Sequence, residues 1–236
     1  MHSRLVLVLL LAPPMAFYMI MLLGSDSIAA LTREDGYVET FGALCFLVTA
    51  VAFLMSFRAR HNVFYLLFGL LFLFGFLEEI SYGQRLFGFA TPSFFLQHNV
   101  QQEFNIHNLE WLHGGEEAGA STGYADKALN MDRLFSAFWF SYCVLAPVLC
   151  YVSVTASRMA KRIRLPIIPV VIGMMFLLNY VVAKGLEVAA PSLASHVIEI
   201  KETSFAYLFA GFAVVEYVTV RGVDLIARRA PNGRGS

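Results

Sequence analysis

The chain has little charge and little cysteine. Charged residues make up 14% of its 236 residues and balance to a formal net charge of zero, whereas soluble domains usually carry about 25% charged residues. The sequence has no basic stripe interleaved with aromatic residues, so we expect no nucleic-acid partner. Its three cysteines stand inside apolar runs without a CxxC pair, which argues against a disulfide framework.

What the chain has instead is long hydrophobic runs. Hydrophobic residues make up 58% of it, and the mean hydropathy is +0.65. Six runs of roughly 18–23 residues are long enough to cross about 30 Å of hydrocarbon as helices. We therefore predict an all-α polytopic membrane protein in which residues 1–236 form a single domain, a bundle of about six transmembrane helices. The predicted spans are residues 5–24, 39–57, 62–82, 133–155, 166–187 and 204–222.

The first run has a second interpretation, because MHSR precedes it as in a signal peptide. The run is long for that role, contains Pro13-Pro14 and lacks a small-x-small cleavage site. We expect it to be a span.

Basic residues predict the orientation. In a six-span chain, 11 of the 17 basic residues fall on one side of the membrane, where Glu216 and Asp224 are the acidic residues. The positive-inside rule makes that side the cytoplasm. We therefore expect cytoplasmic termini and extracytoplasmic loops at 25–38, 83–132 and 188–203. The 11 basic residues are Arg4, Arg58, Arg60, Arg158, Lys161, Arg162, Arg164, Arg221, Arg228, Arg229 and Arg234.

The loop at 83–132 is too long for a simple connector, and we expect it to form an interfacial or re-entrant cap. Thr91-Pro92 predicts the start of a short helix. The Gly-rich, acidic stretch 114–123 predicts a solvated loop.

Two adjacent carboxylates, Glu78 and Glu79, stand where the third apolar run ends. One interpretation is an ion pair between Glu78 and Arg85 at the membrane interface. In the other, one carboxylate is a metal ligand or a general base. At spacings of i+3, i+4 and i+7, Glu78 is expected to share one helical face with Ser81, Tyr82 and Arg85.

Polar side chains then occupy every second position from residue 99 to 107. A period of two predicts an extended backbone with these side chains on one face. In one interpretation, Glu103 and His107 bind a metal or move protons while the amides orient a substrate. In the other, the amides form a structural lid that caps helix ends. The residues are Asn99, Gln101, Glu103, Asn105 and His107.

A third candidate lies before the last predicted span. His196 and Glu199 have the HxxE spacing of carboxylate–histidine metal sites in helical bundles. The alternative is the solvated start of an amphipathic helix, with Lys201 neutralising Glu199 and Glu202.

Three of these motifs resemble those of a family of multi-pass bacterial membrane proteins, which combines EDG…E, EEISWGQR and NxQxExNxHN. The resemblance covers residues 33–110, with Tyr82 where the family has Trp. It implies a polytopic protein of the bacterial inner membrane and no particular reaction. The matching residues are Glu34, Asp35, Gly36 and Glu39, then Glu78, Glu79, Ile80, Ser81, Gly83, Gln84 and Arg85, and then Asn99, Gln101, Glu103, Asn105, His107 and Asn108.

A weaker resemblance is to CAAX-protease-like intramembrane metallopeptidases, with motifs EExxxR, FxxxH and HxxxN or HxxxD. Glu78-Glu79 and the spacing of Phe94 to His98 match the first two. Arg85 comes two residues too late, and Ile200 breaks the last motif, so the protease activity is not carried over.

The sequence thus predicts an extracytoplasmic carboxylate and histidine site. We expect a hydrolase or transferase, with a divalent metal (Zn, Mn, Fe or Ca) as candidate cofactor, acting on a lipid or lipid-linked substrate. The alternative is a non-enzymatic transporter or complex subunit whose polar cap binds an ion or a partner. Candidate catalytic residues are Glu78, Glu79, Glu103 and His107; substrate-binding residues are Tyr82, Gln84, Arg85, Asn99, Gln101, Asn105 and Asn108; metal ligands are Glu79, His107, His196 and Glu199.

Overall fold

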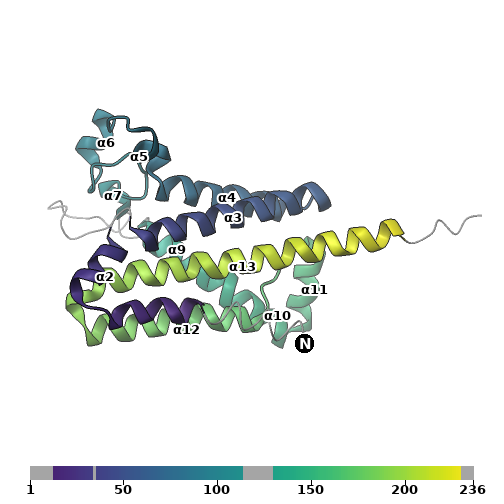
Figure 1. Ribbon diagram of the computed structural model, residues 1–236. Helices are drawn as coiled ribbons and strands as arrows, with labels where there is room; N and C mark the ends of the chain where they lie inside the picture. Colours follow the sequence, from purple (N-terminus) through teal and green to yellow (C-terminus); the bar gives the residue numbers. More distant parts are fainter. Residues whose placement is uncertain (1–12, 34–35, 114–129, 230–236) are drawn as a thin grey trace, which may run out of the picture.

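The computed structural model describes residues 13–33, 36–113 and 130–229, and every regular element in these ranges is a helix (Figure 1). The predicted all-α class is confirmed. The elements are η1 (Tyr18–Leu22), α2 (Ser25–Thr32), α3 (Tyr37–Arg60), α4 (Val63–Glu79), η2 (Ser81–Gly83), α5 (Gln84–Phe87), α6 (Ser93–His98), α7 (Glu110–His113), α9 (Met131–Trp139), the π-helix η3 (Phe140–Leu145), α10 (Ala146–Val152), α11 (Val154–Ile163), α12 (Val170–Ala189), η4 (Pro191–Leu193) and α13 (Ala194–Arg229).

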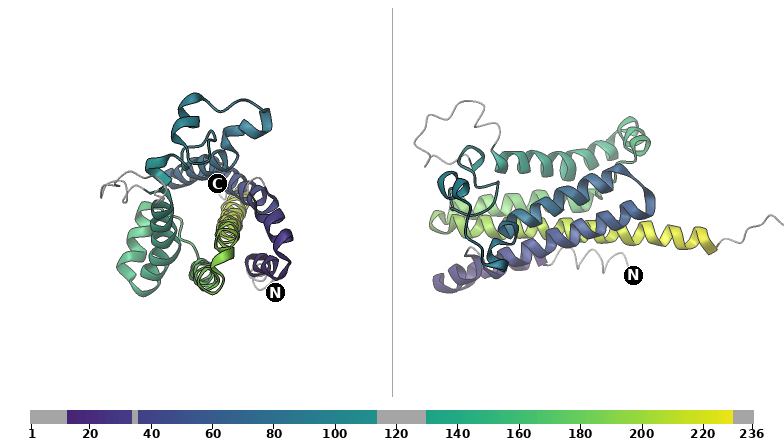
Figure 2. Two further views of the ribbon diagram at one scale, coloured as in Figure 1. Left: turned by 90° about the vertical axis from the view of Figure 1, so that its left-hand side faces the viewer. Right: turned by 90° about the horizontal axis from the view of Figure 1, so that it is seen from above.

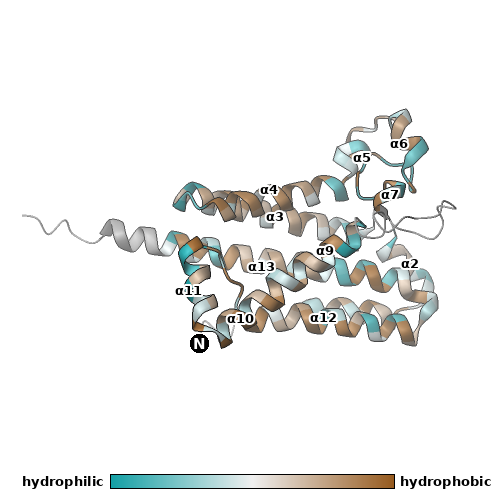
Figure 3. Cartoon of the chain, turned by 180° about the vertical axis from the view of Figure 1, so that it is seen from behind, coloured by the Kyte–Doolittle hydropathy of each residue, from teal (hydrophilic) through white to brown (hydrophobic). Residues whose placement is uncertain are grey.

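Four helical stretches are long and apolar enough to cross a membrane, which indicates a membrane protein. They match four of the six predicted spans. Figure 3 shows the apolar residues along α3 and α4 and the polar ones at the segment that follows α4. The four stretches are Ser25–Arg60, Met131–Val152, Val170–Ala189 and Pro191–Gly222.

The other two predicted spans, 62–82 and 5–24, are seen in part. Helix α4 has 17 residues, a length of about 25 Å against about 30 Å of hydrocarbon. Of the predicted span 5–24, the structure describes the apolar helical segment Pro13–Leu22. Residues 5–12 lie outside the described ranges. The motif residues Glu34 and Asp35 and the loop 114–123 also lie outside them.

Helix α13 occupies the centre of the bundle (Figure 2). Helices α3 and α4 lie along one side of it, and α12 and the η3 region along others. It has 36 residues and begins at Ala194, ten residues before the predicted span. Residues 194–203 fall in the connection predicted at 188–203, and they are helical, as both interpretations of His196 and Glu199 require; their polar side chains interrupt the apolar run without interrupting the helix.

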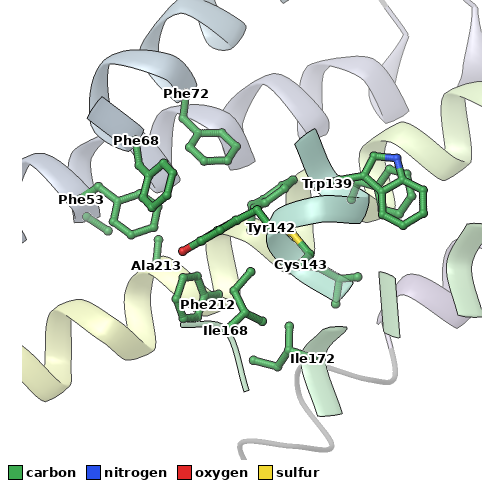
Figure 4. Packing of buried hydrophobic residues seen from close by; sticks show 14 of the residues in the cluster. Phe53, Phe68, Phe72, Trp139, Tyr142, Cys143, Ile168, Ile172, Phe212 and Ala213 are labelled. Carbon is green, nitrogen blue, oxygen red and sulfur yellow. The ribbon is translucent and has the colours of Figure 1, made fainter. Parts of the chain in front are cut away.

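Aromatic rings fill the middle of the bundle (Figure 4). The ring centroid of Phe68 in α4 lies 4.7 Å from that of Tyr142 in η3. The ring of Phe209 in α13 lies 4.7 Å from both Phe72 in α4 and Phe176 in α12. Such pairs contribute about 0.5–1.5 kcal/mol each beyond their buried area. Since lipid is as apolar as these side chains, close packing is what holds helices together in a membrane.

A tight turn joins α3 to α4. His61 adopts a left-handed conformation (φ 49°) that ends α3, and the Asn62 side chain accepts a hydrogen bond from Phe64 N at 3.1 Å, which caps α4. The same amide donates to the carbonyl oxygen of Arg164 at 2.6 Å. The turn is thereby attached to the end of α11.

The π-helix η3 brings α12 unusually close. Pro147 has no N–H group, so the carbonyl of Cys143 loses the partner it would have in an α-helix. Gly173 of α12 packs against that carbonyl, and a Cβ at position 173 would overlap its oxygen. The sequence therefore needs a glycine at this contact.

A buried polar contact links three segments. The Tyr18 hydroxyl donates to Asn179 Oδ1 at 2.7 Å, and Asn179 Nδ2 donates to the carbonyl of Lys201 at 2.9 Å. Asn179 is fully buried. An amide at this depth therefore ties the N-terminal segment and α12 to α13.

Candidate functional site

Helix α4 ends at Glu79, and the chain then reverses. Ser81, Tyr82 and Gly83 all have positive φ angles, of 45°, 52° and 82°, which favour glycine and are uncommon elsewhere. The expectation that Glu78 shares one helical face with Ser81 and Tyr82 is therefore wrong. The Ser81 hydroxyl instead donates to Glu103 Oε2 at 2.7 Å. We call residues 80–113 the cap segment; it lies at the end of the bundle that also carries α2 (Figure 1).

The Glu78 carboxylate holds the cap segment to the bundle. Its Oε2 atom accepts hydrogen bonds from the backbone N–H groups of Ile106 and His107, both at 2.8 Å. His107 Nδ1 lies 3.1 Å from the same oxygen. Glu78 is 4% exposed. Three converging donors stabilise a buried carboxylate, so Glu78 both fixes the loop and orients the imidazole.

Tyr82 lies beside this pair. Burial and the neighbouring Glu78 carboxylate raise the pKa of the Tyr82 phenol well above its usual range. The ring of Tyr82 packs on Phe104 at a centroid distance of 5.3 Å. Phe89 and Phe95 also pack on the ring of Phe104. The phenol is a neutral hydrogen-bond donor at the edge of the site.

Residues 99–107 do not form the extended ladder that their alternation predicts. Asn99 Oδ1 accepts from Gln101 N at 2.9 Å and Glu103 N at 3.2 Å, while Asn99 Nδ2 donates to Asn105 Oδ1 at 2.7 Å. Gln102 has a φ of 57°. The expected extended backbone is wrong because the Asn99 side chain bonds the backbone that follows it and folds the segment into turns. Asn99 also bridges to Leu109.

Other amides of the motifs also build the cap segment. Gln84 Oε1 accepts from Phe104 N at 2.7 Å, and Gln84 Nε2 donates to Thr91 Oγ1 at 2.6 Å. The Asn108 amide donates to Gln101 Oε1. These contacts fit the interpretation of a structural lid. The predicted substrate-binding role of the amides stays a prediction, and the side chain of Arg85 lies outside the described part of the structure.

Carboxylates from several helices gather next to Glu78. Glu79 interacts electrostatically with Glu39 of α3 and with Glu199 and Glu202 of α13. Glu202 lies 3.6 Å from Lys201 Nζ and also interacts with His107 and with Asp132 of α9.

Glu202 was noted beside His196 and Glu199 but was not among the predicted ligands, and Asp132 was not a candidate. The signal for Glu202 was its i+3 spacing from Glu199. For Asp132, the signal was its place in the first turn of a helix, after the N-capping Asn130.

His196 takes a different partner from the one expected. Its Nδ1 lies 2.8 Å from Thr32 Oγ1 of α2. Among the described side chains, no three of the His, Cys, Asp and Glu residues are grouped so that they could hold a metal ion. The predicted set of Glu79, His107, His196 and Glu199 therefore does not form a ready metal site, and metal binding stays a prediction.

At the end of the bundle, then, are a Glu78–His107 pair, a neutral phenol and several carboxylates. They come from α3, α4, α9, α13 and the cap segment. Comparison with protein-family models, with curated proteins and with solved structures found no match, so the family resemblance of the sequence motifs also stays a prediction.

Proposed function

We propose that the protein is a membrane enzyme, a hydrolase or transferase of lipid or lipid-linked substrates, in which Glu78 and His107 form the proton-transfer pair. The supporting observation is the 3.1 Å contact between His107 Nδ1 and Glu78 Oε2. The proposed location is the extracytoplasmic face of a bacterial inner membrane, with both termini in the cytoplasm.

The pair has the chemistry of an oriented general base. A carboxylate that accepts the Nδ1 proton fixes the neutral tautomer in which Nε2 carries the lone pair. The His107 side chain is 35% exposed and that of Glu78 is 5% exposed. Water or a substrate hydroxyl can therefore reach the imidazole while the carboxylate stays shielded. The Tyr82 hydroxyl hydrogen-bonds the Glu78 carboxylate and helps to keep that carboxylate in its ionised form.

The surroundings favour an amphipathic substrate. The cap segment, which also carries His107, exposes large apolar side chains, with Leu86 and Phe87 at 77% and 76% exposure and Phe94 and Trp111 also exposed. Apolar groups of this kind lie in the interfacial zone of a bilayer, where lipid headgroups are found. A lipid held there places its polar group beside His107.

The test uses the full-length protein, purified in detergent and incubated in micelles with the polar lipid extract of the expression host. Mass spectrometry compares the products formed by wild type, Glu78→Gln and His107→Ala. We expect a product that wild type forms and His107→Ala forms about 10²-fold more slowly or less, the usual size of a general-base effect. His98→Ala is the matched control, because His98 is also a cap histidine and lies 3.9 Å from exposed Glu110. Equal product from wild type and His107→Ala, or none from wild type, contradicts the proposal.

A second candidate function, binding of a cation or a protein partner without catalysis, is favoured by the negative charge that Glu39, Glu199 and Glu202 place around Glu79, although no three of the described side chains are grouped to hold a metal ion on their own. Carboxylates placed together attract cations. Calorimetric titration of the purified protein with Ca²⁺ and Mn²⁺, beside Glu79→Gln, tests this function. Saturable binding that the substitution weakens, without any lipid product, favours it over the enzyme.

A further inference from the structure

Helix α11 runs across the bundle axis at the end opposite the cap segment (Figures 1 and 3). Ser153 has an extended backbone (φ −125°, ψ 115°) that separates α11 from α10, and its hydroxyl accepts from Ala156 N at 3.3 Å. Arg164, in a left-handed conformation, ends the helix, and its carbonyl is held by Asn62 at 2.6 Å. Both ends of α11 are thus fixed, and the helix lies crosswise where α10 ends.

Apart from Val154 at its first position, which is exposed on the other face, the apolar side chains of α11 form one stripe. They occupy positions i, i+3, i+4 and i+7, namely Ala156, Met159, Ala160 and Ile163, which share a face of a helix. Ala160 is buried against the bundle, whereas Met159 is 65% and Ile163 is 44% exposed. One side of the stripe therefore packs on the protein, and the other side, with Met159 and Ile163, is only partly covered.

The opposite face of α11 is basic. Arg158, Lys161 and Arg162 have i, i+3 and i+4 spacing and are all exposed. Further basic residues, Arg58 and Arg60 at the end of α3 and Arg164 and Arg221, belong to the same end of the bundle. Glu216 on this part of α13 accepts a hydrogen bond from Tyr65 at 2.6 Å. This end consequently carries an excess of positive charge.

We propose that α11 lies in the plane of the membrane surface and binds the headgroups of anionic phospholipids. Its exposed Met159 and Ile163 enter the upper acyl region, while Arg158, Lys161 and Arg162 contact the headgroup phosphates. A helix that combines a basic face with exposed apolar side chains fits an anionic lipid surface. A soluble polyanion would satisfy the charges and leave the two apolar side chains in water. This proposal does not depend on the proposed function of the cap end.

The test measures lipid preference with the full-length protein. Detergent-solubilised wild type is titrated with phosphatidylglycerol and, separately, with phosphatidylcholine, and bound lipid is counted by native mass spectrometry. We expect wild type to prefer phosphatidylglycerol, and Arg158→Gln/Arg162→Gln to bind it about 30-fold more weakly, at roughly 1 kcal/mol for each basic side chain near an anionic surface.

Two control variants make the result decisive. Arg158→Lys/Arg162→Lys keeps both charges and is expected to keep the preference. Arg33→Gln removes an exposed charge at the cap end of the bundle and is expected to leave the preference unchanged. The proposal is overturned if wild type shows no preference, if the double glutamine variant retains it, or if Arg33→Gln weakens it as much.

Discussion

Replacement of Glu78 by glutamine tests the link between the bundle and the cap segment. In the wild type, Ile106 N and His107 N each lie 2.8 Å from Glu78 Oε2. The glutamine side chain has the same shape, and its oxygen can accept both of these hydrogen bonds. It lacks the negative charge. Hydrogen bonds to a charged group contribute about 1.5–3 kcal/mol and neutral ones about 0.5–1.5 kcal/mol, so the loss is about 1 kcal/mol for each of the two backbone donors.

A second effect adds to this loss. Glu78 Oε1 is buried, and among the described atoms it has no hydrogen-bond partner. In the variant, the new NH₂ group must occupy that position or displace the oxygen, at a cost of about 1 kcal/mol or more for an unsatisfied donor. Local opening of the cap segment should therefore become easier by about 2–3 kcal/mol, which corresponds to roughly 30- to 150-fold.

The assay is hydrogen exchange, read by mass spectrometry on a peptide that covers Ile106 and His107. We expect their amide protons to exchange roughly 30- to 150-fold faster in Glu78→Gln. Glu110→Gln is the control, because Glu110 has a side-chain exposure of 48%. Exchange in Glu78→Gln within about twofold of wild type would refute the view that this carboxylate holds the cap.

Three further predictions concern the bundle and the metal. Gly173→Ala should destabilise the protein by about 1–3 kcal/mol, the usual cost of overpacking, because the new methyl group overlaps the carbonyl of Cys143; an unchanged melting temperature in detergent would contradict that contact. Asn179→Leu should lower stability by about 0.6–2 kcal/mol, since it removes the Oδ1 acceptor of the Tyr18 hydroxyl and the Nδ2 donor to the Lys201 carbonyl, and a smaller loss in Asn179→Leu made on a Tyr18→Phe background would measure the coupling. Elemental mass spectrometry should find less than one equivalent of bound metal in purified wild type, since no three described ligands are grouped; near-stoichiometric metal that His107→Ala loses would instead establish a metal centre.

The sequence predicted the helices well and their polar ends poorly. Apolar runs placed α3 and α4 to within three residues, because burial in lipid requires continuous apolar side chains. Helix α13 began earlier than predicted, since hydropathy falls at His196 and Glu202 while the backbone hydrogen bonds of the helix continue. A hydropathy criterion finds the apolar part of a helix and not the helix itself.

For the candidate site, residue types could be predicted and their partners could not. Glu78 and His107 were both selected from the sequence, but their contact spans 29 positions and depends on how the cap segment folds. That folding uses left-handed backbone at Ser81 and Tyr82, which are residues that rarely adopt it. The alternation around Asn99 is compatible with a strand or with a series of turns, and the hydrogen bonds of the Asn99 side chain to the residues that follow it favour the turns.

The length of α13 has a mechanical consequence. With 36 residues, it is a rod of about 54 Å, longer than a bilayer core is thick. Its first turns carry Glu199 and Glu202 next to the cap segment, and its later turns meet Tyr65 and Arg60 near α11. A rod of this length that pivots by about ten degrees moves its far end by about 9 Å. One continuous helix therefore joins the carboxylates beside the cap segment to the basic end of the bundle near α11.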